Sequence, residues 1–160
     1  MYNELVMDYS RLKKYKGKID NAIVQEGKNI SCGDEIILYV KLEDNKVIDA
    51  KFEGIGCAIS QASANLMIEN IIGKSLEEVK ELIENVNLMV NGSEYDKEKL
   101  GLISELSEIK NYPMRIKCFL LAWKTLQLLI KKNTWKNFGK WYNKSGISGV
   151  SQVKKVIDET

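Results

Sequence analysis

Residues 35–53 read EIILYVKLEDNKVIDAKFE, and this stretch decides the fold. Apolar and polar residues alternate on both sides of Asp44-Asn45, a polar pair suited to a tight turn. Alternation with period two is typical of strands that bury one face. We therefore expect an antiparallel hairpin with strands at 35–42 and 47–53. The residues expected on its buried face are Ile36, Leu38, Val40, Leu42, Ile48, Ala50 and Phe52.

Helical periodicity dominates the rest of the chain. The expected helices span residues 1–15, 59–72, 76–90 and 114–130. Ser75 and Glu78 form a capping box before the third, and Pro113 is well suited to open the last because its missing N–H is not needed there. We expect a lysine-rich loop up to Asn29 and a polar bridge before Pro113. This order of elements predicts an α+β fold, with helices packed on one face of a small antiparallel sheet.

Composition limits the classes of function. A chain of 160 residues with 44% hydrophobic residues fits one globular domain. Charged residues interrupt every apolar run before the roughly 20 residues that a membrane span needs. The chain has no histidine, which excludes Cys-His and Ser-His dyads and a histidine-ligated zinc. Three cysteines and a start unlike a signal peptide suggest free thiols in the cytoplasm.

Charge is distributed unevenly along the chain. Residues 131–160 contain seven lysines against two carboxylates, a net charge of +5, which leaves −3 for residues 1–130 out of the total of +2. We therefore divide the chain into a domain at 1–130 and a basic extension of unknown role at 131–160. Such an extension can bind nucleic acid or an acidic partner. Runs of charge are more often simply exposed to solvent, so we interpret residues 131–160 as a solvated extension.

The three cysteines all fall at the ends of expected elements. Cys32 precedes the first hairpin strand, Cys57 follows the second, and Cys118 lies in the first turns of the last helix. A tight turn at 44–45 brings the first two to the same end of the hairpin. Asp34 lies on the same strand face as Cys32, because residues two apart in an extended segment point the same way.

Three sulfurs and one carboxylate have the ligand types of a tetrahedral zinc site. Glycines at 33, 54 and 56 leave the backbone open to a close approach. The spacing alone leaves other interpretations open, because no Cys-x-x-Cys pair is present and free cysteines commonly pack in cores. Asp34 alone would read as a solvated carboxylate, and Arg115 as a surface charge.

Three blocks of sequence resemble the SufU/IscU/NifU iron–sulfur assembly family. They are Ser31-Cys32-Gly33-Asp34, the run from Asp49 to Ala64 that contains Gly54-Ile55-Gly56-Cys57-Ala58-Ile59-Ser60, and Pro113-Met114-Arg115-Ile116-Lys117-Cys118. The resemblance covers roughly residues 1–130. The lack of histidine, and lysine rather than histidine before the third cysteine, make the chain most similar to the SufU branch. It departs from the family at Lys28-Asn29-Ile30, where an Asn-Pro type turn is usual.

The resemblance implies a small, about three-stranded sheet and zinc held by Cys32, Asp34, Cys57 and Cys118. It also implies that the chain accepts persulfide sulfur from a separate, pyridoxal-phosphate-dependent, SufS-like cysteine desulfurase and passes it to downstream iron–sulfur assembly proteins, so it would not be a stand-alone enzyme. The IscU branch implies instead a scaffold for a [2Fe–2S] cluster, or iron, on the same ligands. A third hypothesis is an interaction module without redox or transfer chemistry, in which zinc only stabilises the fold. We expect neither a membrane nor nucleic acid as a partner.

Within the first hypothesis, Cys32 is the residue expected to react. It lies on a glycine-flanked loop, whereas a helix fixes Cys118, so a partner can displace Cys32 most easily. A metal-bound thiolate is already deprotonated, unlike most free thiols at neutral pH. Arg115 lies three residues before Cys118 in the expected last helix and so should be near the site. It is expected to stabilise negative charge on the bound sulfur.

Overall fold

The predicted hairpin is part of a three-stranded antiparallel sheet with strand order β1-β2-β3. The strands are β1 (Ile23–Asn29), β2 (Asp34–Glu43) and β3 (Lys46–Ile55). The computed structural model describes residues 3–145, with side chains up to residue 133. The α+β class and the small antiparallel sheet are confirmed.

The hairpin turn forms as expected, but the strands after it contain a bulge. Asp44 and Asn45 both have positive φ, 50° and 64°, which suits the twist of the two strands. The pairing then skips Ile48, because Lys41 faces Asp49 while Leu42 faces Val47. Val47 is consequently buried and Ile48 is 43% exposed. The prediction that Ile48 lies on the buried face was wrong, since the extra residue shifts the alternation.

Strand β1 lies in the segment that the sequence predicted to be loop, and that prediction was wrong. Its residues, IVQEGKN, alternate only between half-buried and exposed positions. It pairs along its whole length with β2, from Ile23 opposite Val40 to Asn29 opposite Asp34. Backbone pairing defines this edge strand, and its side chains leave little apolar periodicity to detect.

The helices begin largely where their start signals predicted. They are α1 (Glu4–Ser10), α2 (Ala58–Ile71), α3 (Leu76–Val90), α4 (Lys97–Leu100), the 3-10 helix η1 (Gly101–Asn111) and α5 (Pro113–Ser145). The capping box at Ser75 and Glu78 is present in both directions, and α5 starts at Pro113.

Three helical segments differ from expectation. The first helix was expected over residues 1–15 but spans only Glu4–Ser10. The expected polar bridge folds into α4 and η1, which bury Leu100, Ile103, Leu106 and Ile109. Helix α5 continues past Ile130 to Ser145, so half of the predicted extension is helical backbone. Residues 146–160 and the side chains of 134–145 lie outside the described part of the chain. The separate extension at 131–160 and its role therefore stay predictions.

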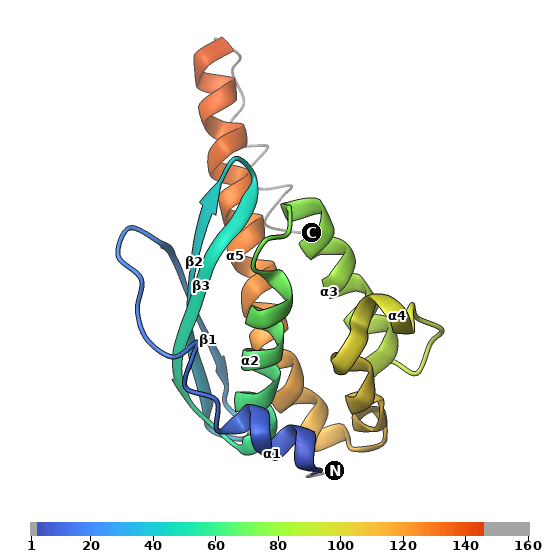
Figure 1. The fold of residues 1–160 in the computed structure, drawn as a ribbon. Helices are drawn as coiled ribbons and strands as arrows, with labels where there is room; N and C mark the ends of the chain where they lie inside the picture. Colours follow the sequence, from blue (N-terminus) through green and yellow to red (C-terminus); the bar gives the residue numbers. More distant parts are fainter. Residues whose placement is uncertain (1–2, 146–160) are drawn as a thin grey trace.

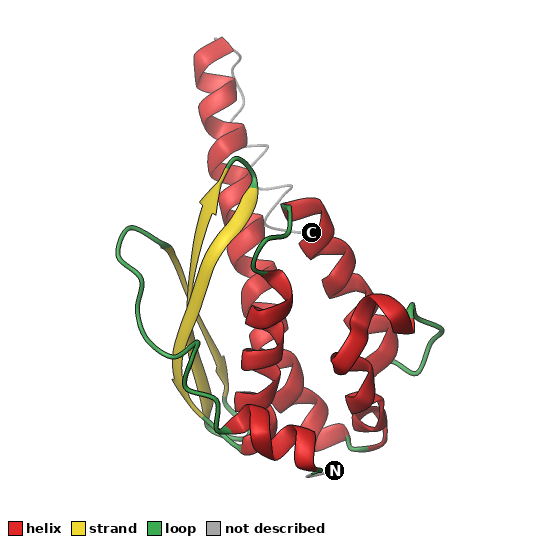
Figure 2. Cartoon of the chain, in the orientation of Figure 1, coloured by secondary structure: helices red, strands yellow, loops and turns green. Residues whose placement is uncertain are grey.

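The elements form layers on one side of the sheet. Helices α2 and α5 pack against each other and against the strands, while α1 packs on α2, and α3 and η1 lie against α5 (Figures 1 and 2). The largest fully buried side chains include Trp123, Phe52 and Phe119, between these layers. None of the helices in the described range is both long and apolar enough to cross a membrane.

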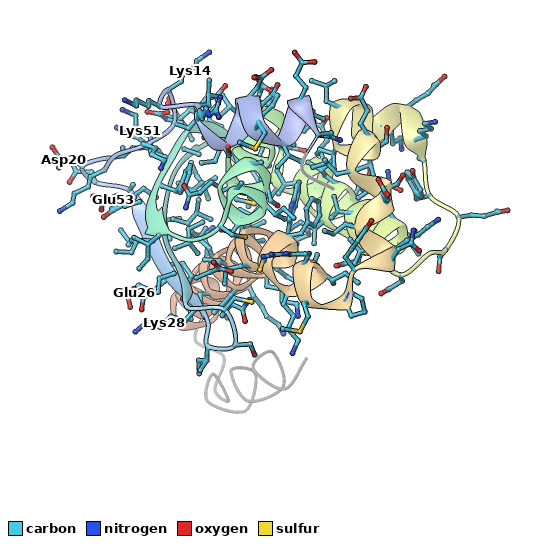
Figure 3. All side chains as sticks on the ribbon, turned by 90° about the horizontal axis from the view of Figure 1, so that it is seen from below. Lys14, Asp20, Glu26, Lys28, Lys51 and Glu53 are labelled. Atoms are coloured by element: carbon cyan, nitrogen blue, oxygen red, sulfur yellow. The ribbon has the colours of Figure 1, made fainter. Side chains whose placement is uncertain are left out.

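The opposite face of the sheet points away from the helices and is rich in charge. Figure 3 shows Glu26 and Lys28 of β1 and Lys51 and Glu53 of β3 along this outer side. Tyr39 is buried among them, and its hydroxyl donates to Glu53 Oε1 at 2.7 Å. The helices therefore cover one face only, as the alternation in the hairpin predicted.

One end of the sheet gathers four chain segments. The β1–β2 loop, the end of β3, the start of α2 and the first turns of α5 converge there, at the lower end of the molecule in Figure 1. These segments contain all three cysteines.

Candidate metal centre

Asp34, the first residue of β2, lies at the middle of this end of the sheet and is only 2% exposed. Burying a carboxylate is costly unless donors satisfy it. Here Oδ1 accepts the backbone N–H of Cys57 at 3.2 Å, and Oδ2 accepts the side-chain amide of Asn29 at 3.5 Å. Asp34 is therefore a fixed, inward-facing carboxylate, and the solvated strand-start alternative does not apply.

Cys32 lies in the tight loop that joins β1 to β2. The backbone N–H groups of Cys32 and Gly33 both donate to the carbonyl of Asn29, at 3.3 and 2.9 Å. Gly33 has a φ of +73°, a conformation that glycine adopts without strain. The loop turns the exposed Cys32 thiol toward the same end of the sheet as Asp34.

Cys57 stands at the junction of β3 and α2, where it is the N-cap residue of the helix. The preceding Gly56 makes the closest approach to the carboxylate. A Cβ atom at Gly56 would lie 2.2 Å from Ser60 Oγ and 2.7 Å from Asp34 Oδ1. Only glycine fits between these atoms, so the chain can pass close enough for the Cys57 N–H to reach Asp34.

Cys118 is the buried member of the set, with no exposed surface. Its thiol lies 3.8 Å from the carbonyl oxygen of Met114 and 4.0 Å from Asn29 Nδ2. Burial raises the pKa of the Cys118 thiol well above its usual range, and interactions with Asp34, Cys32 and Cys57 raise it further. Without a metal this thiol is protonated at neutral pH, so a metal must displace its proton on binding.

Three of the four predicted ligands come together tightly. One ligand atom from each of Cys32, Asp34 and Cys118 lies within 4.8 Å of the other two. Cys57 lies outside this group of three. Its backbone N–H nevertheless donates to Asp34, and its side chain is one of the groups that raise the pKa of Cys118. All three cysteines are free thiols.

Arg115 is placed near the site by its position on α5. It lies three residues before Cys118, and its side chain is half-buried. Its backbone N–H donates to Tyr112 at 2.9 Å in the first turn of the helix. Its expected action on bound sulfur stays a prediction.

Asn29 was missed as a site residue. It is the last residue of β1 and stands directly opposite Asp34. Strand pairing would have indicated this position, but the segment was expected to be loop. Because strand β1 was not predicted, the position of Asn29 opposite Asp34 was not predicted either.

The donor set fits a metal ion or an iron–sulfur cluster. Thiolate sulfurs with one carboxylate are ligands of tetrahedral zinc, and thiolates also hold iron–sulfur clusters. The buried position of Asp34 and Cys118 limits access of water to one side, while exposed Cys32 leaves the other side open. This arrangement suits exchange of a ligand with a partner.

Comparison with protein families gives a match over most of the chain. Residues 1–132 match the family described as the NifU-like N-terminal domain. The chain is 57% identical over 133 residues to the iron–sulfur cluster assembly scaffold protein IscU of Thermotoga maritima, covering 82% of this chain and 94% of that protein. It is 40% identical over 133 residues to the zinc-dependent sulfurtransferase SufU of Bacillus subtilis, covering 82% and 90%.

Solved structures show the same fold. An iron–sulfur cluster assembly scaffold protein for the SUF system from Fervidobacterium islandicum has a TM-score of 0.79 and 56% identity, over 81% of this chain and 96% of that one. A NifU-like N-terminal protein from Brucella abortus has a TM-score of 0.74 at 20% identity, over 82% and 94%. At 20% identity the second likeness concerns the fold alone.

Proposed function

Because the chain belongs to the family of NifU-like N-terminal domains, we propose that it works in iron–sulfur cluster assembly by accepting persulfide sulfur at a zinc site. The proposed ligands are Cys32, Asp34, Cys57 and Cys118. The observation that supports this most is the placement of an exposed thiol, Cys32, within 4.8 Å of a buried carboxylate and a buried thiol.

The residues divide into fixed and displaceable ligands. Asp34 is held by two hydrogen bonds and Cys118 by a helix and complete burial. Cys32 lies on an exposed loop, so a partner can draw it away without unfolding an element. Zinc, when bound, keeps the sulfurs as thiolates and rigidifies the site.

Cys32 is the proposed sulfur acceptor. Its thiolate attacks the outer sulfur of a persulfide on the partner enzyme, forming a new S–S bond. The bond between the two sulfurs of the partner breaks, and the partner cysteine leaves as a thiolate. The product is a persulfide on Cys32, with no net oxidation. Arg115, half-buried nearby on α5, is proposed to stabilise the negative charge on this sulfur.

The partner is proposed to be a pyridoxal-phosphate-dependent cysteine desulfurase, which generates the persulfide that this chain only receives. Downstream iron–sulfur assembly proteins would then take the sulfur. A cytoplasmic location is part of the proposal, because three free thiols suit a reducing compartment.

A scaffold for a [2Fe–2S] cluster is the second candidate. Two relatives at 56–57% identity are described as cluster assembly scaffold proteins. Thiolates with one carboxylate can hold a cluster as well as zinc, so the same four residues would serve. In that case iron and sulfide are the cargo of the site.

Metal analysis and reconstitution separate the two candidates. Stoichiometric zinc in the purified protein, which blocks iron loading, would favour sulfur transfer. A stable, transferable brown cluster after anaerobic reconstitution would favour the scaffold. Zinc without any reaction with a desulfurase would leave only a structural zinc module.

Replacing Cys32 by serine tests the acceptor directly. The Cys32→Ser protein should stay folded, because this side chain is exposed, but should lose persulfide loading from a desulfurase. Loading is measured by the mass gain of 32 Da for one sulfur on the intact protein. Undiminished loading of the variant would exclude Cys32 as the acceptor.

A further inference from the structure

Asn29, the last residue of β1, contacts several parts of the candidate metal centre. Its backbone pairs with Asp34, and its carbonyl accepts the N–H groups of Cys32 and Gly33 at 3.3 and 2.9 Å. Its side-chain Nδ2 lies 3.5 Å from Asp34 Oδ2 and 4.0 Å from Cys118 Sγ. One residue therefore contacts three of the four proposed ligands.

The chemistry of the amide suits this position. Asp34 and Cys118 are both buried, and their ligand atoms lie within 4.8 Å of each other, so polar partners must satisfy both groups inside the protein. An amide NH₂ has two donors and no charge, so it can bond to the carboxylate and to the sulfur together. It thus fixes the carboxylate and the sulfur relative to each other, and as an amide it does not compete for the metal as a carboxylate would.

We propose that Asn29 is a positioning residue, whose side-chain amide holds Asp34 and Cys118 in place before a metal arrives. This inference rests on the proposed function and assigns a residue to the same site. Hydrogen-bond partners of metal ligands fix the orientation of those ligands, and losing such a partner commonly lowers metal affinity about 10–100-fold.

The neighbouring Ile30 supplies a matched control. It follows Asn29 as the first residue of the β1–β2 loop, but its side chain is 93% exposed. A change there perturbs the loop sequence without removing the amide. Asn29→Leu removes both donors at nearly constant size, and Asn29→Ala is a second variant in case leucine disturbs the strand end.

The experiment measures the site with and without a metal. Zinc affinity is measured by competition with a chromophoric chelator, and the visible absorption of the Co²⁺-substituted protein reports coordination geometry. On the metal-free protein, the rate of Cys118 alkylation by iodoacetamide is followed by peptide mass spectrometry. Thermal unfolding of each metal-free variant checks that the fold is retained.

We expect Asn29→Leu and Asn29→Ala to bind zinc about 10–100-fold more weakly, with altered Co²⁺ bands and faster alkylation of Cys118. Ile30→Ala should match the wild type in all three. Wild-type Co²⁺ bands and a wild-type alkylation rate in both Asn29 variants would overturn the inference and leave the proposed function intact. If the wild type binds neither zinc nor cobalt, the zinc proposal fails, and the alkylation rates alone still decide the role of Asn29.

Discussion

At the scale of single residues, the site depends on close approaches of backbone to carboxylate. Asp34 receives the N–H of Cys57 only because Gly56 has no side chain. The sequence pointed to Cys32, Asp34, Cys57 and Cys118 through their spacing and family blocks. It missed Asn29, whose relevance depends on strand pairing and a contact across 89 residues to Cys118.

Gly56→Ala should damage the site more than its small size suggests. The new Cβ would lie within 2.7 Å of Asp34 Oδ1 and within 2.2 Å of Ser60 Oγ. Overpacking of this kind costs about 1–3 kcal/mol, and here it also displaces the carboxylate. We expect lower stability in urea unfolding and weaker zinc binding. Adding Ser60→Ala should relieve one clash but not restore zinc affinity, and full restoration would contradict the role given to Asp34.

At the scale of elements, the starts of helices were easier to predict than the edge strand and the bulge of the sheet. The capping box of α3 and the proline of α5 act locally, so the sequence showed both. The edge strand β1 and the bulge at Ile48 depend on pairing with β2, which no local pattern reports. Helix η1 was missed because apolar residues about three apart, from Ile103 to Ile109, were read as part of a polar bridge.

Helix α1 is tied to α2 by a hydrogen bond whose strength depends on pH. The hydroxyl of Tyr9 donates to Glu69 Oε2 at 2.6 Å, and this bond, with desolvation, raises the pKa of Tyr9 from 10.0 to about 12. The folded state holds this proton longer than the unfolded state. The contribution to stability is therefore complete below pH 10 and is lost as the pH rises toward 12.

Tyr9→Phe should accordingly lower the free energy of unfolding by about 1 kcal/mol below pH 10. The difference from the wild type should shrink above pH 10. Urea unfolding of the wild type and the variant, below and above pH 10, measures this difference in the free energy of unfolding. Glu69→Gln should abolish the same pH dependence, whereas a difference that stays constant up to pH 12 would contradict the assigned bond.

At the scale of the whole molecule, the described core ends before the basic extension begins. Among the residues whose side chains the structure describes, the last buried ones are Leu129 and Ile130, and the family match ends at residue 132. Helix α5 nevertheless continues to Ser145 without an acidic residue. Composition revealed the basic segment, but the continuity of its helix with the core helix was not predicted, because the lysines suggested a solvated tail.

A chain that ends at Asn133 should keep the fold and the metal centre. The truncation removes five lysines and two carboxylates, so the net charge changes from +2 to −1. We expect unchanged zinc stoichiometry, unchanged sulfur loading and an unfolding temperature close to that of the full chain. Loss of desulfurase-dependent loading, with zinc retained, would instead show that the extension contributes to partner binding.

The ligands of the candidate site come from three separate stretches of the chain, around residues 32–34, 57 and 118, and no two cysteines are close in sequence. An unfolded chain therefore offers a metal no ready chelate, unlike a zinc finger with paired cysteines. The protein must reach its tertiary structure first, and the ion then binds as any ligand binds a folded receptor. By mass action, zinc at about 100 times its dissociation constant would stabilise the fold by about 2.7 kcal/mol. The melting temperature should thus rise continuously with zinc concentration and fall back, without unfolding the protein, when a chelator removes the ion.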